Sequence, residues 1–141
     1  MFCRVKVRTS QFGIVVSAAA AMLLATARLP VAAAEFPYDQ EMLLDVKPLP
    51  GSKRVPILEI GIDGRAQVDL WCRSGLAQVA VSGDAITFTL GPLREERCTP
   101  ERSERDDAMV AALSQVTQWR IEDDVVLLIG PTELRFRLST H

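Results

Sequence analysis

The chain contains almost no histidine. Its 141 residues include a single one, His141, which is the last residue. Serine and cysteine hydrolases need a firmly held histidine as general base, so we expect neither a Ser/His/Asp nor a Cys/His catalytic site. The chain also has no glycine-rich phosphate loop, because its Gly61–Gly64 segment is typical of a hairpin turn. The sequence therefore predicts a protein that is not an enzyme.

Cysteine is scarce as well, with only Cys3, Cys72 and Cys98. Their spacing fits no structural zinc pattern. The acidic cluster Glu122–Asp124 lacks the spaced oxygen ligands and the glycine of a calcium loop, so a solvated turn is the simpler interpretation. We expect no metal and no cofactor. The 18 acidic residues leave a glycosidase-type carboxylate pair open, although nothing singles one out.

No apolar run is long enough to cross a membrane. The run from Ile14 to Ala25 has 12 residues, whereas a spanning helix needs about 20. Small residues follow at 32–34, and basic residues precede the run at Arg4, Lys6 and Arg8. This order is typical of a secretory signal peptide. We predict a cleaved signal over residues 1–34, with Ala27 as an alternative cleavage position, and a periplasmic or secreted bacterial protein.

Removal of that signal makes the protein acidic. Twelve basic residues then face 18 acidic ones, a formal net charge of −6 over about 107 residues. A diffuse negative field disfavours nucleic acid and anionic lipid as partners. The remaining length suits one domain. We expect no stable membrane span after cleavage, and as partner either an unknown envelope protein or a small apolar ligand.

Short alternating runs separated by turn signals predict a mainly β fold. We expect a small antiparallel curled sheet or barrel-like meander with one α-helix packed on it. The expected strands are 66–72, 86–90, 134–138 and a fully buried 125–129. The turn signals between them are Asp63-Gly64, Ser74-Gly75, Gly83-Asp84, Gly91-Pro92 and Gly130-Pro131.

One helix is expected over residues 100–118. Thr99 and Pro100 suit its N-cap and first position, and an apolar stripe of Met109, Ala112, Leu113 and Val116 faces the sheet. Trp119, just after the helix, is a core anchor or a ligand-stacking ring. Trp71 lies opposite the apolar face of its strand. Both tryptophans are candidate ligand-binding residues.

The segment before the β domain lacks the regular alternation of the predicted strands. Pro37, Pro48 and Pro50 interrupt residues 35–54, so we expect an extended N-terminal arm with one short strand over 41–46. The β domain is then expected over residues 55–141.

Cys72 and Cys98 have two interpretations. In an oxidising compartment they form a structural disulfide that ties the sheet to the helix. Alternatively Cys98, just before the helix, is active in thiol exchange, although Cys72 is too distant in sequence for a Cys-x-x-Cys motif. We expect the disulfide.

Six short phrases follow one another along the chain: Asp63-Gly64-Arg65, Val68–Cys72, Cys98–Arg102, Leu113–Trp119, Val125–Gly130 and Leu134–Phe136. Together they resemble the META domain family of HslJ-like exported bacterial proteins. The resemblance covers residues 55–138 and departs at the first cysteine, where many relatives have Gly-Cys-Asn and this chain has Trp71-Cys72-Arg73. The resemblance implies a barrel-like sheet with one helix, a structural cysteine pair, an envelope-stress link and no agreed catalytic residue.

Our leading hypothesis is an exported, non-enzymatic domain with a binding or envelope-stress role. A first alternative is a carrier that holds a small apolar ligand at the barrel mouth, with Trp71 or Trp119 in the pocket. A second is a thiol-disulfide active protein acting through Cys98.

Overall fold

The computed structural model describes Gly13 and residues 32–140. The predicted signal peptide lies almost entirely outside the described residues, so its cleavage stays a prediction. Within the described part of the chain, no helix has both the length and the apolarity that crossing a membrane requires.

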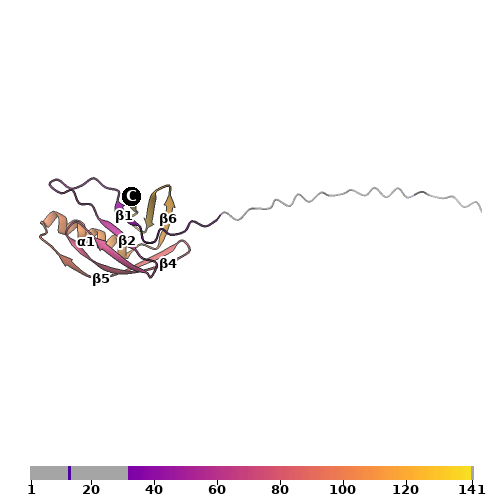
Figure 1. Cartoon of the computed structure of the whole chain (residues 1–141), viewed down its shortest axis with the longest axis horizontal. Coiled ribbons are helices and arrows are strands. Elements are labelled where there is room, and N and C mark those ends of the chain that lie inside the picture. Colours follow the sequence, from indigo (N-terminus) through magenta and orange to yellow (C-terminus); the bar gives the residue numbers. More distant parts are fainter. Residues whose placement is uncertain (1–12, 14–31, 141) are drawn as a thin grey trace, which may run out of the picture. The chain divides into compact units, whose positions relative to one another are not determined.

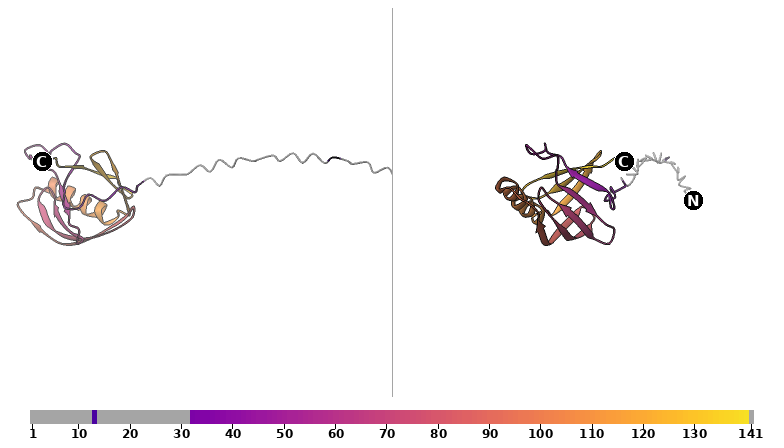
Figure 2. Two further views of the ribbon diagram at one scale, coloured as in Figure 1. Left: turned by 45° about the vertical axis from the view of Figure 1, so that its right-hand side comes forward. Right: turned by 60° about the vertical axis from the view of Figure 1, so that its left-hand side comes forward.

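Eight antiparallel strands close into a barrel in chain order, with β1 beside both β2 and β8 (Figure 1). The predicted mainly β fold with one helix is confirmed. Figure 2 shows the sheet curling around on itself. The strands are β1 Glu41–Leu44, β2 Ile57–Ile60, β3 Arg65–Asp69, β4 Arg73–Ser82, β5 Ala85–Glu95, β6 Gln118–Glu122, β7 Val125–Ile129 and β8 Leu134–Leu138.

The strands form a barrel because alternate side chains are apolar and can all face one interior. β3 shows this pattern clearly, since Ala66 and Val68 are buried, Arg65 and Gln67 are exposed and Asp69 is half-buried. β7 has its three central residues buried, as its uninterrupted apolar sequence predicts. The inward side chains form one hydrophobic cluster whose most deeply buried members include Met42, Leu58, Ile60, Val68, Ile86, Val126, Leu128 and Phe136.

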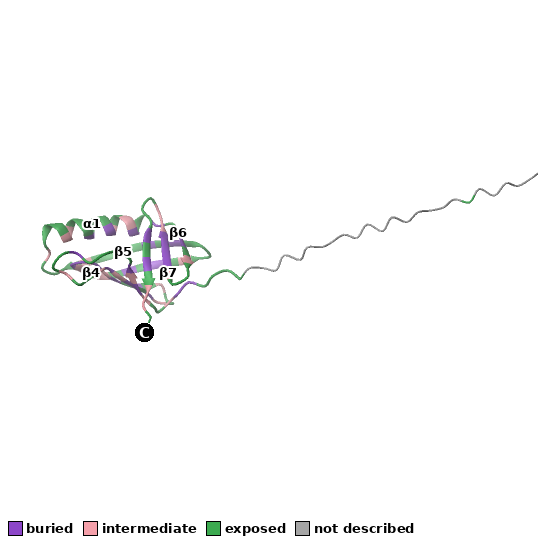
Figure 3. Ribbon diagram, turned by 90° about the horizontal axis from the view of Figure 1, so that it is seen from above, coloured by how far each residue is buried: buried purple, intermediate pink, exposed green. Residues whose placement is uncertain are grey.

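The helix α1, Pro100–Ser114, connects β5 to β6 and packs against β5. Thr99 is its N-cap, as predicted, and its side-chain oxygen accepts a hydrogen bond from the Arg102 N–H at 3.4 Å. Met109 and Leu113 face the barrel, and Figure 3 shows the remaining surface of α1 largely exposed. The helix ends four residues before the predicted Gln118 because the chain turns into β6, although Val116 is still buried.

Two of the predicted turns are wrong. Ser74-Gly75 lies inside β4 and Gly91-Pro92 lies inside β5. Turns do occur at Gly64 and Gly83, where φ is +80° and +60°. The two misread pairs instead meet across the β4–β5 ladder, where the register shifts.

The N-terminal segment contributes more than the expected arm. Its strand, shorter than the predicted 41–46, is β1, and it closes the barrel by pairing with β8. Phe36 is also buried and meets Trp119 edge to face, with ring centroids 4.9 Å apart. Proline interrupts the regular structure of this segment without keeping its apolar residues out of the core.

Candidate functional site

A bulge in β5 shapes the outer surface of the barrel. Gly75 pairs with Leu93 and Ala77 pairs with Leu90, so Gly91 and Pro92 together oppose the single residue Leu76. Two residues opposite one is the definition of a β-bulge, and it interrupts the ladder where Pro92 has no N–H to donate.

Glycine is required at both edges of this bulge because the backbones approach closely. A Cβ added to Gly75 would lie 2.7 Å from the carbonyl oxygen of Pro92 and 2.8 Å from the Leu93 side chain. A Cβ on Gly91 would lie 2.9 Å from the carbonyl oxygen of Leu76. The two glycines therefore allow the backbones of β4 and β5 to approach closely. They contribute no side chains to the surface between these strands.

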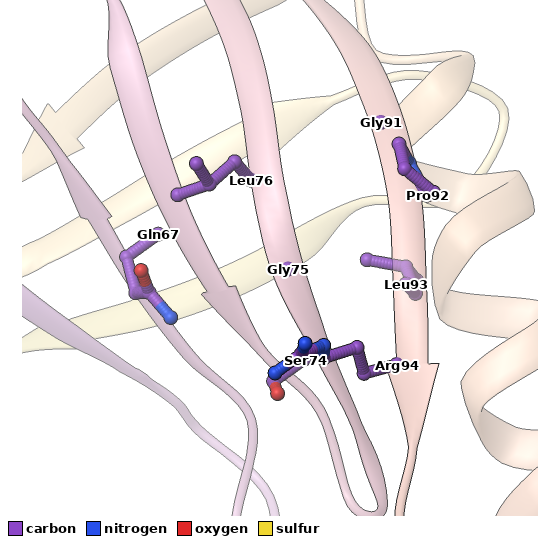
Figure 4. A pocket seen from close by; sticks show the side chains of 8 residues that line it. All are labelled: Gln67, Ser74, Gly75, Leu76, Gly91, Pro92, Leu93 and Arg94. Carbon is purple, nitrogen blue, oxygen red and sulfur yellow. The ribbon is translucent and has the colours of Figure 1, made fainter.

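The result is a hollow of about 640 Å³ on the outer face of β3, β4 and β5 (Figure 4), hereafter the sheet hollow. Leu76 is 59% exposed within it, and Pro92 and Leu93 add further apolar surface. Figure 4 shows the Arg94 side chain running across Ser74 at one end. The full lining is Gln67, Ser74, Gly75, Leu76, Gly91, Pro92, Leu93 and Arg94.

The sheet hollow has the composition of a binding site. Its volume falls within the range of about 300 to 1,000 Å³ that is usual for small-molecule pockets, and its mostly apolar lining has a few polar groups at the edge. The lining contains no histidine, cysteine or carboxylate. Asp69, the cross-strand neighbour of Ser74, does not line the hollow. Arg94 forms no ion pair among the described residues.

Three of the four predicted site residues, Trp71, Cys72 and Cys98, lie elsewhere, near the start of α1, whereas Trp119 lies in β6. Cys72 and Cys98 form a disulfide with a Cα–Cα distance of 5.4 Å, which confirms the predicted pair. It connects the turn between β3 and β4 to the N-terminal end of the helix. β3 ends at Asp69 rather than at the predicted Cys72, because Leu70–Cys72 form this turn.

Asp106, a residue that the sequence analysis overlooked, holds the same turn. Its side chain is fully buried, and its carboxylate accepts hydrogen bonds from the backbone N–H groups of Trp71 and Arg73 at 2.9 Å and of Cys72 at 3.1 Å. The Cys72 Sγ atom also lies 3.1 Å from Oδ2. This last approach is a contact only, because a disulfide sulfur has no proton to donate.

Arg73 fastens the turn to the helix from outside. Its guanidinium pairs with Asp107 and Glu95 and donates a hydrogen bond to the Ser103 hydroxyl at 2.7 Å. The hydrogen bond to Asp107 raises the pKa of Arg73 above its usual value, and Glu95 adds to the increase while partial burial opposes it. Arg73 therefore stays charged at every pH that a folded domain meets.

The two candidate tryptophans have different surroundings. Trp71 is buried, with the Arg105 guanidinium 6.0 Å from its ring centroid, and its indole N–H has no hydrogen-bond partner among residues 32–140. Trp119 is buried in β6, and its indole N–H donates to the Gly83 carbonyl at 2.8 Å. Trp119 therefore has its polar group satisfied within the fold, whereas Trp71 does not.

Comparison with known proteins agrees with this architecture. An NMR structure of a protein from Burkholderia xenovorans superposes with a TM-score of 0.56 at 17% identity, covering 81% of this chain and 99% of that one. A second NMR structure gives 0.53 at 18% identity, covering 71% and 89%. At these identities the likeness shows the fold alone. No curated protein matches the chain. Residues 41–139 match the META domain, a span that contains all eight strands, the helix and both disulfide cysteines, and the chain therefore belongs to the META domain family.

Proposed function

We propose that this protein is an exported, non-enzymatic binding domain of the bacterial envelope that holds a small apolar ligand with one acidic group in the sheet hollow. The observation that carries the proposal is the bulge at Gly91 and Pro92, which opens a largely apolar hollow beside the cation Arg94. The signal-like N-terminus supports the periplasmic location, and the family resemblance supports an envelope-stress role, in which the ligand or an envelope protein is the partner.

Each part of the hollow has a distinct task in this proposal. Leu76, Pro92 and Leu93 take the apolar body of the ligand, because covering the exposed Leu76 removes apolar surface from water. Arg94 receives the acidic group, since a guanidinium forms two parallel hydrogen bonds with a carboxylate. Gln67 and Ser74 are further polar groups at the rim.

The outer hollow supports ligand binding better than the barrel mouth does. The inward side chains of the strands belong to one hydrophobic cluster, in which Phe136, Leu58 and Ile60 are fully buried. Phe36 packs on Trp119, one of the two tryptophans that the barrel-mouth alternative would use. Thiol exchange through Cys98 is also less well supported, because its sulfur is bonded to Cys72 and the Asp106 carboxylate lies against that partner. A negative charge there disfavours a thiolate.

The test uses the mature protein labelled with ¹⁵N and titrated with octanoate. Octanol supplies the chain without the charge, and acetate supplies the charge without the chain. We expect octanoate to bind more tightly than either and to shift the amide signals of residues 74–76, 91, 93 and 94. Arg94→Gln should weaken octanoate binding about 10-fold or more, since a hydrogen bond to a charged group contributes about 1.5 to 3 kcal/mol.

Two matched controls make this experiment decisive. Arg135→Gln changes an exposed arginine on β8, and Ile62→Ser changes an exposed apolar residue in the β2–β3 turn. Both variants should bind octanoate like the parent protein. The sheet hollow would be refuted as the site if octanoate shifted only the amide signals of buried core residues. Equal octanoate affinity of the parent protein and Arg94→Gln would refute it as well.

A further inference from the structure

A second pocket lies beside the disulfide at the start of α1, hereafter the arginine pocket. It has a volume of about 410 Å³ and is lined by Arg54, Trp71, Cys72, Glu96, Arg97 and Arg102. Three arginines and one glutamate give it a formal charge of +2. This local charge is opposite in sign to the −6 of the predicted mature chain.

The positive charge of the arginine pocket is not neutralised within the fold. Arg54, Arg97 and Arg102 form no ion pair with any described residue, whereas Arg73 and Arg105 nearby are paired with Asp107 and Glu101. Acidic residues in the first turns of the helix thus pair with arginines outside the pocket. The three arginines that line the pocket keep their N–H donors available.

Trp71 adds an independent observation. It lines the pocket and is 6% exposed, and its Nε1 is buried with no hydrogen-bond partner in residues 32–140. Buried polar groups are normally hydrogen-bonded, so each exception needs an explanation. An indole N–H can only donate, and the group that would satisfy it must be an acceptor.

The loop that carries Arg97 is held in place before any ligand arrives. Arg97 has φ = +27°, a conformation that non-glycine residues rarely adopt and that often occurs at functional sites. On one side the Glu96 N–H donates to the Cys72 carbonyl at 2.9 Å, and on the other Cys98 is bonded to Cys72. Arg102 lies in the first turn of α1, where the helix dipole adds partial positive charge.

We propose that the arginine pocket binds a phosphate group, with the three guanidinium groups and the Trp71 N–H as donors. The charge of +2 matches a phosphate dianion, and arginine is the side chain best suited to phosphate oxygens. The group could come from free phosphate or from the head group of an envelope lipid. This site is separate from the sheet hollow and stands whether or not that hollow binds a ligand.

The test measures phosphate binding by the oxidised mature protein through ¹⁵N amide shifts, at constant ionic strength and with chloride as reference. We expect saturable shifts at residues 71–73, 96–99 and 101–103. Arg102→Gln should weaken binding about 10-fold. Trp71→Phe, which removes the N–H and keeps an aromatic ring, should weaken it about 3- to 10-fold. Arg135→Gln makes the same chemical change at an exposed arginine on β8 and should have no effect.

Vesicles containing phosphatidylglycerol, with neutral vesicles as reference, distinguish the two sources of phosphate. Inorganic phosphate binding without vesicle binding supports a small soluble ligand, whereas vesicle binding that inorganic phosphate displaces supports a lipid head group. Phosphate shifts no larger than those of chloride, or affinities unchanged in both Arg102→Gln and Trp71→Phe, would overturn the proposal. Near-ultraviolet circular dichroism and an intact disulfide establish that each variant is folded.

Discussion

Asp106→Asn tests how the helix is fastened to the barrel. In the native fold Oδ1 accepts from the Trp71 N–H, while Oδ2 accepts from Cys72 and Arg73. Asparagine has nearly the same shape, but it offers one oxygen and one NH₂ group. Whichever way the amide is turned, at least one buried backbone N–H then faces another donor.

The expected destabilisation follows from counting these donors. One buried N–H left without a partner costs about 1 to 3 kcal/mol. The two remaining hydrogen bonds lose a charged acceptor, which lowers the contribution of each by roughly 1 kcal/mol. We therefore expect the free energy of unfolding to fall by about 3 to 5 kcal/mol, a large part of the 5 to 15 kcal/mol typical of a small domain.

Urea unfolding of the oxidised mature protein measures this change, because the midpoint and slope give the free energy in water. Asp107→Asn is the matched control: it makes the same substitution one residue along the helix, at an exposed carboxylate. Asp107 does pair with Arg73, but it is 66% exposed. An exposed ion pair contributes about 0 to 1 kcal/mol, so the free energy of unfolding of this variant should fall by less than about 1 kcal/mol. If Asp106→Asn behaves like Asp107→Asn, or loses less than about 1 kcal/mol with an unchanged slope, the three backbone contacts do not hold the helix as argued.

Two further predictions concern the disulfide and processing. Replacing Cys72 and Cys98 together by alanine removes a crosslink over a sequence separation of 26, and urea unfolding should show a loss of about 3.5 kcal/mol; two free thiols in the exported parent protein, found by mass spectrometry, would contradict the disulfide. Signal cleavage after Ala34 should give a periplasmic protein whose N-terminal sequencing begins at Glu35, and a start after Ala27 or an uncleaved chain would disprove that site.

The parts of the fold that follow from local pattern were predictable. Alternation gave the core-facing residues of β3, β5 and β8, and the continuous apolar run gave buried β7. The apolar stripe at helical spacing gave the barrel-facing side of α1. In each case the spacing of apolar residues along the element indicates which side chains are buried. The prediction therefore needed no knowledge of contacts with distant parts of the chain.

Asp106 could not be assigned on that basis, because an acidic residue near a helix start usually serves the helix dipole at the surface. A signal was nonetheless present. Asp106 precedes Met109 by three positions and Leu113 by seven, which places it on the same buried stripe. A carboxylate on an apolar stripe needs donors, and Trp71, Cys72 and Arg73 supply them from a turn more than thirty positions away in sequence.

The sheet hollow was missed for a related reason. Ser74-Gly75 and Gly91-Pro92 have the composition of turns, and only the pairing of two long strands shows that they form one bulge. Local rules are broken in proteins most often where function or strain requires it. The two misread pairs both line the sheet hollow, which is one reason to place ligand binding there.

Net charge says little about a local binding site because it averages over the whole chain. A phosphate group responds mainly to charges within about 8 Å at physiological salt, the distance over which exposed charges are screened. Within the arginine pocket the unpaired charges are mostly positive, although acidic residues outnumber basic ones in the predicted mature protein. A chain whose predicted mature form has a net charge of −6 is therefore compatible with the proposed phosphate site, because three arginines supply positive charge at that one place.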